Sequence, residues 1–111
     1  MDTESLEATA RHLARHRARN ELRQAWRCAV ELTMLDPQQG RWWAQRGALA
    51  AAVGYDEDML GAMRQATYLF RHTNAPGRAE AIALWLSRRG VTLSEARAPH
   101  GTARRALRKL S

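Results

Sequence analysis

The stretch Leu35–Gly54, LDPQQGRWWAQRGALAAAVG, decides the fold of this chain. Pro37 ends one helical segment, because proline lacks the backbone N–H and disfavours helix at the residue before it. The alanine- and arginine-rich run that follows predicts a helix over Arg41–Val53, since these residues lose little entropy on entering a helix. Gly54 then provides the residue at which a helix most readily ends. This stretch therefore predicts a short helix bounded by tight turns. An array of such helices follows if the same pattern of breakers recurs along the chain.

Similar breakers divide the rest of the chain, at Asn20, Asn74–Gly77, Gly90 and Pro99–Gly101. No segment alternates with period two, so no strand is predicted. The expected helices are Thr3–Arg19, Glu21–Leu35, Arg41–Val53, Asp56–Arg71 and Gly77–Arg89. Beyond them, Thr92–Glu95 has the spacing of a capping box that opens a short helix, and a basic helix is expected over 102–110. With 111 residues, the chain is predicted to be one all-α domain, 1–111.

The residues around Pro37 resemble the tetratricopeptide repeat (TPR), a helix–turn–helix unit of about 34 residues. With Pro37 matched to the proline near the end of a unit, the next unit begins at Gly40. Trp43 then falls on a bulky position of the first helix, Gly47 on a small one, and Gly54 on the glycine between the two helices. The resemblance covers roughly residues 6–98 and is best over 25–54. Leu13 departs from it by occupying a small position, and Pro99 interrupts the last unit.

The resemblance implies three antiparallel helix pairs, 6–39, 40–75 and 76–98, stacked as a short right-handed solenoid and capped by the helix 102–110. Each pair has too little apolar surface to form a core alone, so its neighbours must cover it. The expected core residues are Trp26, Leu32, Trp43, Leu49, Met63, Tyr68, Leu69, Phe70, Leu84, Trp85 and Leu86.

The resemblance also implies a concave face formed by the first helix of each pair. Its residues would be Glu7, Ala10, Ala14, Arg17 and Ala18, then Arg41, Ala44, Ala48, Ala51 and Ala52, then Glu80, Leu84, Ser87 and Arg88. The alanines in its middle would let a partner's backbone approach closely, which suits an extended peptide or an amphipathic helix. The same alanines could instead pack against another helix of this chain. From this face we predict a partner-binding set of Ala14, Arg17, Arg41, Ala44, Ala48, Ala51, Ala52, Leu84 and Arg88.

Some TPR co-chaperones grip a C-terminal carboxylate with Lys and Asn at fixed positions. The matching positions here hold Ala10, Arg11, Ala14, Gln45 and Ala48, so that clamp is not expected. Small TPR proteins of this length resemble the export chaperones of bacterial type III secretion, which hold a helical subunit in the groove. That resemblance implies a cytoplasmic adaptor or chaperone of another protein.

The formal charge of +7 leaves two interpretations open. It can reflect an arginine-rich composition, or it can indicate an anionic partner such as nucleic acid, a membrane surface or an acidic protein. Arg104, Arg105, Arg108 and Lys109 cluster near the end of the chain, and Arg11–Arg27 form a second basic stretch. A basic helical nucleic-acid-binding protein is therefore the alternative function. Self-association into a homodimer is a third, because short repeat arrays expose apolar ends.

The remaining residue patterns predict no enzyme and no cofactor. The chain has no glycine-rich phosphate loop, nucleophile elbow or metal-binding His-Glu motif. His12 and His16 have helical spacing, but the surrounding arginines oppose a metal ion, so no metal site is predicted. Cys28 is expected to be a small buried apolar residue. No run approaches the ~20 apolar residues of a membrane span, and the polar start Met1–Ser5 is unlike a secretory signal.

Overall fold

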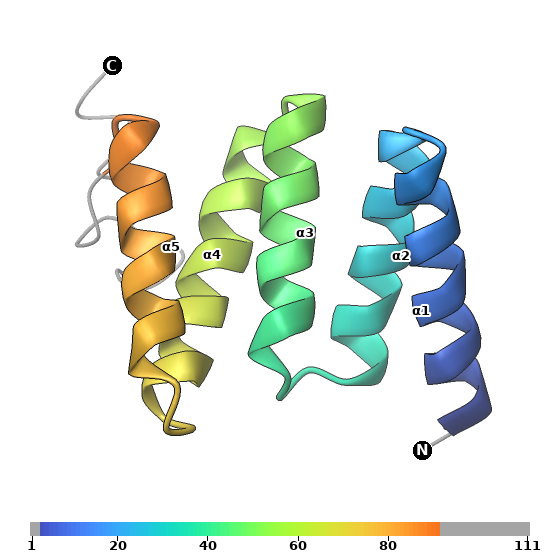
Figure 1. Ribbon diagram of the computed structural model, residues 1–111, viewed down its shortest axis with the longest axis horizontal. Helices are drawn as coiled ribbons and strands as arrows, with labels where there is room; N and C mark the ends of the chain where they lie inside the picture. Colours follow the sequence, from blue (N-terminus) through green and yellow to red (C-terminus); the bar gives the residue numbers. More distant parts are fainter. Residues whose placement is uncertain (1–2, 92–111) are drawn as a thin grey trace.

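The computed structural model describes residues 3–91, and this part of the chain consists of five helices with no strand. Their order along the chain is shown in Figure 1. They are α1 (Thr3–Ala18), α2 (Leu22–Leu35), α3 (Gly40–Val53), α4 (Asp56–Arg71) and α5 (Pro76–Arg88). The predicted all-α class is therefore confirmed for the described residues, and the ends of the five helices predicted between residues 3 and 89 lie within one residue of the observed ends.

The turns between helices depend on residues that adopt left-handed backbone conformations. Gly54 ends α3 with φ 86°, and its N–H bonds to the carbonyls of Ala50 and Ala51. Asn20 and Asn74, after α1 and α4, have φ values of 59° and 60°. Glycine and asparagine adopt this region at the lowest cost, which explains why the helices end at these residues. Such short turns make consecutive helices antiparallel neighbours.

The helices form two layers, because each one packs against the next along the chain: α1 on α2, α2 on α3, α3 on α4 and α4 on α5. In Figure 1, α1, α3 and α5 form the front layer, and all three have their N-terminal ends at the bottom. Helices α2 and α4 lie behind and run in the opposite direction. Consequently α3 and α5 are parallel to each other on the same face of the molecule.

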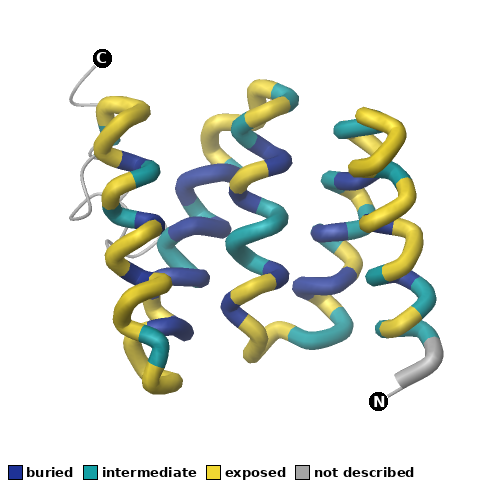
Figure 2. Tube along the Cα trace, in the orientation of Figure 1, coloured by how far each residue is buried: buried dark blue, intermediate teal, exposed yellow. Residues whose placement is uncertain are grey.

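The core consists of two clusters that meet at α3. One includes Leu13, Ala25, Ala29, Leu32 and Leu49, from α1, α2 and α3. The other includes Ala50, Met63, Phe70, Ile82 and Leu86, from α3, α4 and α5. Figure 2 shows buried residues along the sides on which the helices face one another.

Two glycines allow α3 to approach α4 closely. A Cβ atom at Gly40 would lie 2.7 Å from the Phe70 ring, and one at Gly47 would lie 2.8 Å from Cγ of Met63. Both distances are shorter than carbon atoms tolerate. The repeat pattern of the sequence expects a small residue at Gly47. The structure gives the reason, because a larger residue there would collide with Met63.

The predicted core was wrong at two residues. Tyr68 is 56% exposed and Leu84 is 55% exposed. Both satisfy the helical period, but they lie on sides of α4 and α5 that no described helix covers. The adjacent tryptophans also differ from expectation, because Trp42 is buried whereas Trp43, the predicted core residue, is only half-buried. Cys28, predicted to be buried, is half-buried against the α1–α3 cluster.

Several predictions fall outside the described residues. These are the capping box at 92–95, the basic helix at 102–110 and the second half of the unit 76–98. In the part of the chain that is described, no helix is both long and apolar enough to cross a membrane.

Candidate functional site

A groove between α3 and α5 is the first candidate site. It has a volume of about 350 Å³ and lies on the layer formed by α1, α3 and α5. We call it the α3/α5 groove, and it is lined by Arg41, Ala44, Gln45, Ala48, Phe70, Arg78, Ala81 and Ile82. Phe70 reaches it from α4 behind, because α4 packs between the two front helices. The groove is therefore bounded by α3 and α5 at its sides and by α4 at its base.

The side chains of the groove explain its shape. Phe70 and Ile82 are buried in the core cluster beneath it, so they form a rigid apolar base. Ala44, Ala48 and Ala81 line the α3 and α5 sides, and their short side chains keep the space open. A partner helix or strand could bring its own backbone close to α3 here.

The charged residues that line the groove are both arginines. The Arg41 guanidinium lies 4.3 Å from the ring centre of Trp42, and the Arg78 guanidinium lies 5.6 Å from that of Phe70. Cation–π contacts of this kind hold a guanidinium in place without neutralising its charge. No acidic residue is among the described lining residues, so the groove carries positive charge.

The predicted partner-binding residues divide into two groups. Arg41, Ala44 and Ala48 line the groove. The others do not line it: Ala14, Arg17, Ala52, Leu84 and Arg88 are exposed on helices of the same layer, and Ala51 is half-buried against the core. Arg17 is nevertheless connected to the groove, since its Nη1 donates a hydrogen bond to Oε1 of Gln45.

The sequence prediction missed Gln45, Phe70, Arg78, Ala81 and Ile82 as groove residues. For α5 it selected Glu80, Leu84, Ser87 and Arg88, which the resemblance placed on the concave face. The available signal was the helical spacing of the apolar residues Ala79, Ile82 and Leu86, all of which are buried. It fixes which side of α5 faces the core, and therefore which residues stand beside α3.

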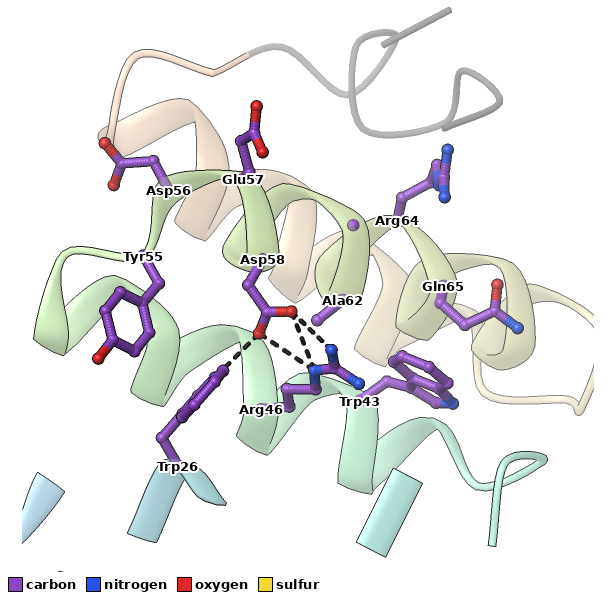
Figure 3. Close-up of a pocket in the computed structure, with 11 residues that line it drawn as sticks. Trp26, Trp43, Arg46, Tyr55, Asp56, Glu57, Asp58, Ala62, Arg64 and Gln65 are labelled. Carbon is purple, nitrogen blue, oxygen red and sulfur yellow. Dashed lines mark hydrogen bonds and ion pairs between the residues drawn. The ribbon is translucent and has the colours of Figure 1, made fainter. Parts of the chain in front are cut away.

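A second, larger pocket lies between α2 and α4, over α3, and Figure 3 shows it in close-up. Its volume is about 790 Å³. We call it the tryptophan pocket, and it is lined by Trp26, Trp43, Arg46, Tyr55, Asp56, Glu57, Asp58, Gly61, Ala62, Arg64 and Gln65. The rings of Trp26 and Tyr55 meet edge to face with their centres 4.8 Å apart.

The polar groups at the base of the tryptophan pocket bind one another. Nε and Nη2 of Arg46 donate to the Asp58 carboxylate, with Nη2 2.6 Å from Oδ1, and Nη1 donates to Oγ1 of Thr33 at 3.0 Å. Trp26 Nε1 also donates to Asp58, at 2.9 Å. This network joins α2, α3 and α4, so its role is structural. In Figure 3, Asp56 and Glu57 point away from it.

Asp56, Glu57 and Asp58 contribute to the structure in two ways. The three acids do occupy the first turn of α4, where the helix dipole favours carboxylates. However, Asp58 is also the acceptor of the network that connects three helices. Sequence spacing alone could not pair Asp58 with Arg46 and Trp26, because these residues meet only after the helices pack.

Neither His16 nor Cys28 lines the α3/α5 groove or the tryptophan pocket. Among residues 3–91 no group of three or more His, Cys, Asp or Glu side chains is placed to hold a metal ion. His16 is paired with Glu21, at 2.8 Å between Nδ1 and Oε1. Partial burial, followed by the charge of Glu31, raises the pKa of the Cys28 thiol, so Cys28 is a poor nucleophile.

Comparison with models of protein families, with curated proteins and with solved structures finds no match to this chain.

Proposed function

We propose that this chain is a non-catalytic protein-interaction module that holds a helical or extended segment of another protein. The observation that carries the proposal is the α3/α5 groove, with its apolar base and short alanine sides. Its dimensions suit a peptide backbone better than a small molecule, because an open, shallow groove surrounds too little of a compact ligand. The tryptophan pocket is less suitable, since the groups at its base already bind one another.

The arrangement of helices supports a finer proposal for the fold. We infer that α1 with α2, and α3 with α4, form TPR-like pairs within the ranges 6–39 and 40–75, and that α5 begins a third. Helices α1, α3 and α5 would then be the first helices of the pairs, which in such repeats line the binding face. The α3/α5 groove is on that layer.

The proposal is tested by Ala48→Glu, which places a carboxylate inside the groove. Ala48 is exposed, so the substitution should leave the circular dichroism melt nearly unchanged. Copurification of the partner from native lysate should be lost. The matched control is Gln24→Glu, which adds the same charge at an exposed position on α2 and should have no effect.

Salt and nuclease treatment distinguish protein binding from nucleic-acid binding. A partner held by apolar burial should remain bound at high salt, whereas phosphate contacts weaken steeply as salt rises. If Ala48→Glu copurifies as well as the unchanged protein, or if nuclease removes everything bound, the groove is not the binding site for a protein.

A further inference from the structure

The two ends of the α3/α5 groove differ in charge. Because α3 and α5 run in the same direction, their first turns lie at the same end of the front layer (Figure 1). Arg41 is in the first turn of α3 and Arg78 is in the first turn of α5. The next turns of both helices contribute Ala44, Gln45, Ala48 and Ala81 to the lining. Both charged side chains of the described lining therefore lie at one end of the groove, and the rest of the lining is uncharged.

The helix dipoles add to the positive charge at the cationic end. The first turns of α3 and α5 contain no acidic residue, and neither helix has a side-chain cap. Arginine is unfavourable at this position, because the N-terminus of a helix carries partial positive charge. The first turn of α4, by contrast, holds three acids. Helices α3 and α5 thus each place a guanidinium where the stability of the helix itself favours a carboxylate.

The two arginines are also available to an acidic ligand. Within the described residues neither forms an ion pair, in contrast to Arg46, which is held by Asp58. Each guanidinium lies near the face of an aromatic ring. A guanidinium stacked on a ring keeps its N–H groups directed outward, which is the geometry that binds a carboxylate bidentately.

We propose that the groove recognises an acidic amphipathic helix that runs antiparallel to α3 and α5, with a pair of carboxylates in its last turn. The apolar face of this helix lies on Phe70 and Ile82, and its acids meet Arg41 and Arg78. The negative end of its dipole then faces the positive ends of α3 and α5. This inference rests on the proposed function and specifies the chemistry and direction of the partner.

A helix explains the groove better than a nucleic acid does. A phosphate backbone needs a series of cations along its path, but the described lining has arginines at one end only. An apolar base, as formed here by Phe70 and Ile82, gains binding energy by covering carbon atoms. An amphipathic helix with acids at one end matches both features.

The test uses synthetic peptides of about 18 residues, long enough to form a helix, with both termini blocked to remove terminal charge. All share one alanine–leucine face. One carries two glutamates in its last turn, the second carries them in its first turn, and the third has glutamine at the last-turn positions. Fluorescence anisotropy with the full chain gives each Kd. We expect the last-turn glutamate peptide to bind roughly tenfold more tightly than the other two, and less so as salt rises.

Two double variants of the protein distinguish an effect of Arg41 and Arg78 from an effect of the overall net charge on peptide binding. The double variant Arg41→Glu/Arg78→Glu should abolish the preference for the last-turn glutamates. The control Arg23→Glu/Arg27→Glu changes the net charge equally on exposed α2 residues and should keep it. Equal Kd values for the three peptides, no binding of any, or equal losses in both double variants would overturn the inference.

The two proposals fail in different ways. If Ala48→Glu abolishes binding of all three peptides while their affinities for the unchanged protein are equal, the groove binds proteins but without the proposed polarity. If Ala48→Glu leaves every Kd unchanged, the peptides bind elsewhere and the proposed function fails as well.

Discussion

Arg46 and Asp58 form a bidentate salt bridge between α3 and α4. Nη2 of Arg46 lies 2.6 Å from Oδ1 of Asp58, and Nε lies 3.0 Å from Oδ2. The pair is mostly shielded from solvent, since the side chains of Arg46 and Asp58 are 20% and 23% exposed. Thr33 and Trp26, both on α2, bind the same two residues. One ion pair therefore links three helices.

Asp58→Asn should destabilise the protein. The asparagine amide cannot provide two anionic acceptors, so the Arg46 guanidinium would remain shielded from solvent with a weaker hydrogen-bonding partner. We expect a loss of about 2 kcal/mol in the free energy of unfolding, as for hydrogen bonds to charged groups. Urea denaturation followed by circular dichroism gives this value. Asp56→Asn, which removes an exposed carboxylate from the same helical turn, is the control and should cost only about a few tenths of a kcal/mol. Equal losses in the two variants would show that the network adds nothing to the helix dipole.

Gly47→Ala should also destabilise, although alanine is the better helix former. The new Cβ would lie 2.8 Å from Met63, which is buried and has to move. Overpacking of a core costs about 1–3 kcal/mol, which exceeds the gain of about 1 kcal/mol in helix propensity. Thermal and urea melts measure the net effect. Gly77→Ala is the matched control, because nothing lies within 4 Å of the place that a Cβ atom would take there, and it should be neutral or stabilising. A Gly47→Ala protein as stable as the Gly77→Ala protein would contradict the close α3–α4 contact.

Cys28 should react slowly with iodoacetamide. Burial and then Glu31 raise the pKa of its thiol, so the reactive thiolate is scarcer at a given pH than in an unfolded chain. The rate–pH curve should lie at higher pH for the folded protein than in urea. Because folding raises the pKa of Cys28, the protonated thiol adds to the free energy of unfolding. This contribution is fully present below the pKa of the thiol in the unfolded chain, and it is lost as pH rises through the pKa of the thiol in the folded protein.

Glu31→Gln checks the cause of this shift, because it removes the charge but not the burial. The curve should move part of the way back toward lower pH. Glu80→Gln, an exposed change on α5, should leave it in place. An unchanged curve in Glu31→Gln would assign the whole shift to burial.

The sequence predicted the helices well because their ends depend on local chemistry. Pro37, Gly54 and Asn74 disfavour helix wherever they occur, and the alanine- and arginine-rich runs between breakers have few alternatives. The last helix shows this clearly: Pro76 fits the first position of α5, and a helix was expected from the next residue.

The contacts between helices were predictable only in part. Trp42 and Trp43 are adjacent and equally apolar, so the sequence could not establish which one faces the core. Leu84 satisfies the period of α5, but its exposure depends on which helices stand beside α5. The Arg46–Asp58 pair and the Arg41–Arg78 end of the groove arise from packing between different helices. A small residue was expected at Gly47, but the side chain that it admits, Met63, was found only in the structure.

The position of α3 between the two core clusters has a consequence for how the molecule unfolds. Leu49 belongs to one cluster and Ala50 to the other, and Trp26 packs against both. Neither cluster can be exposed to water without disturbing the helix that serves the other, so the two halves are expected to melt in one cooperative transition. The amides of α3 should then exchange with deuterium only when the whole domain opens, and more slowly than those of α1 or α5.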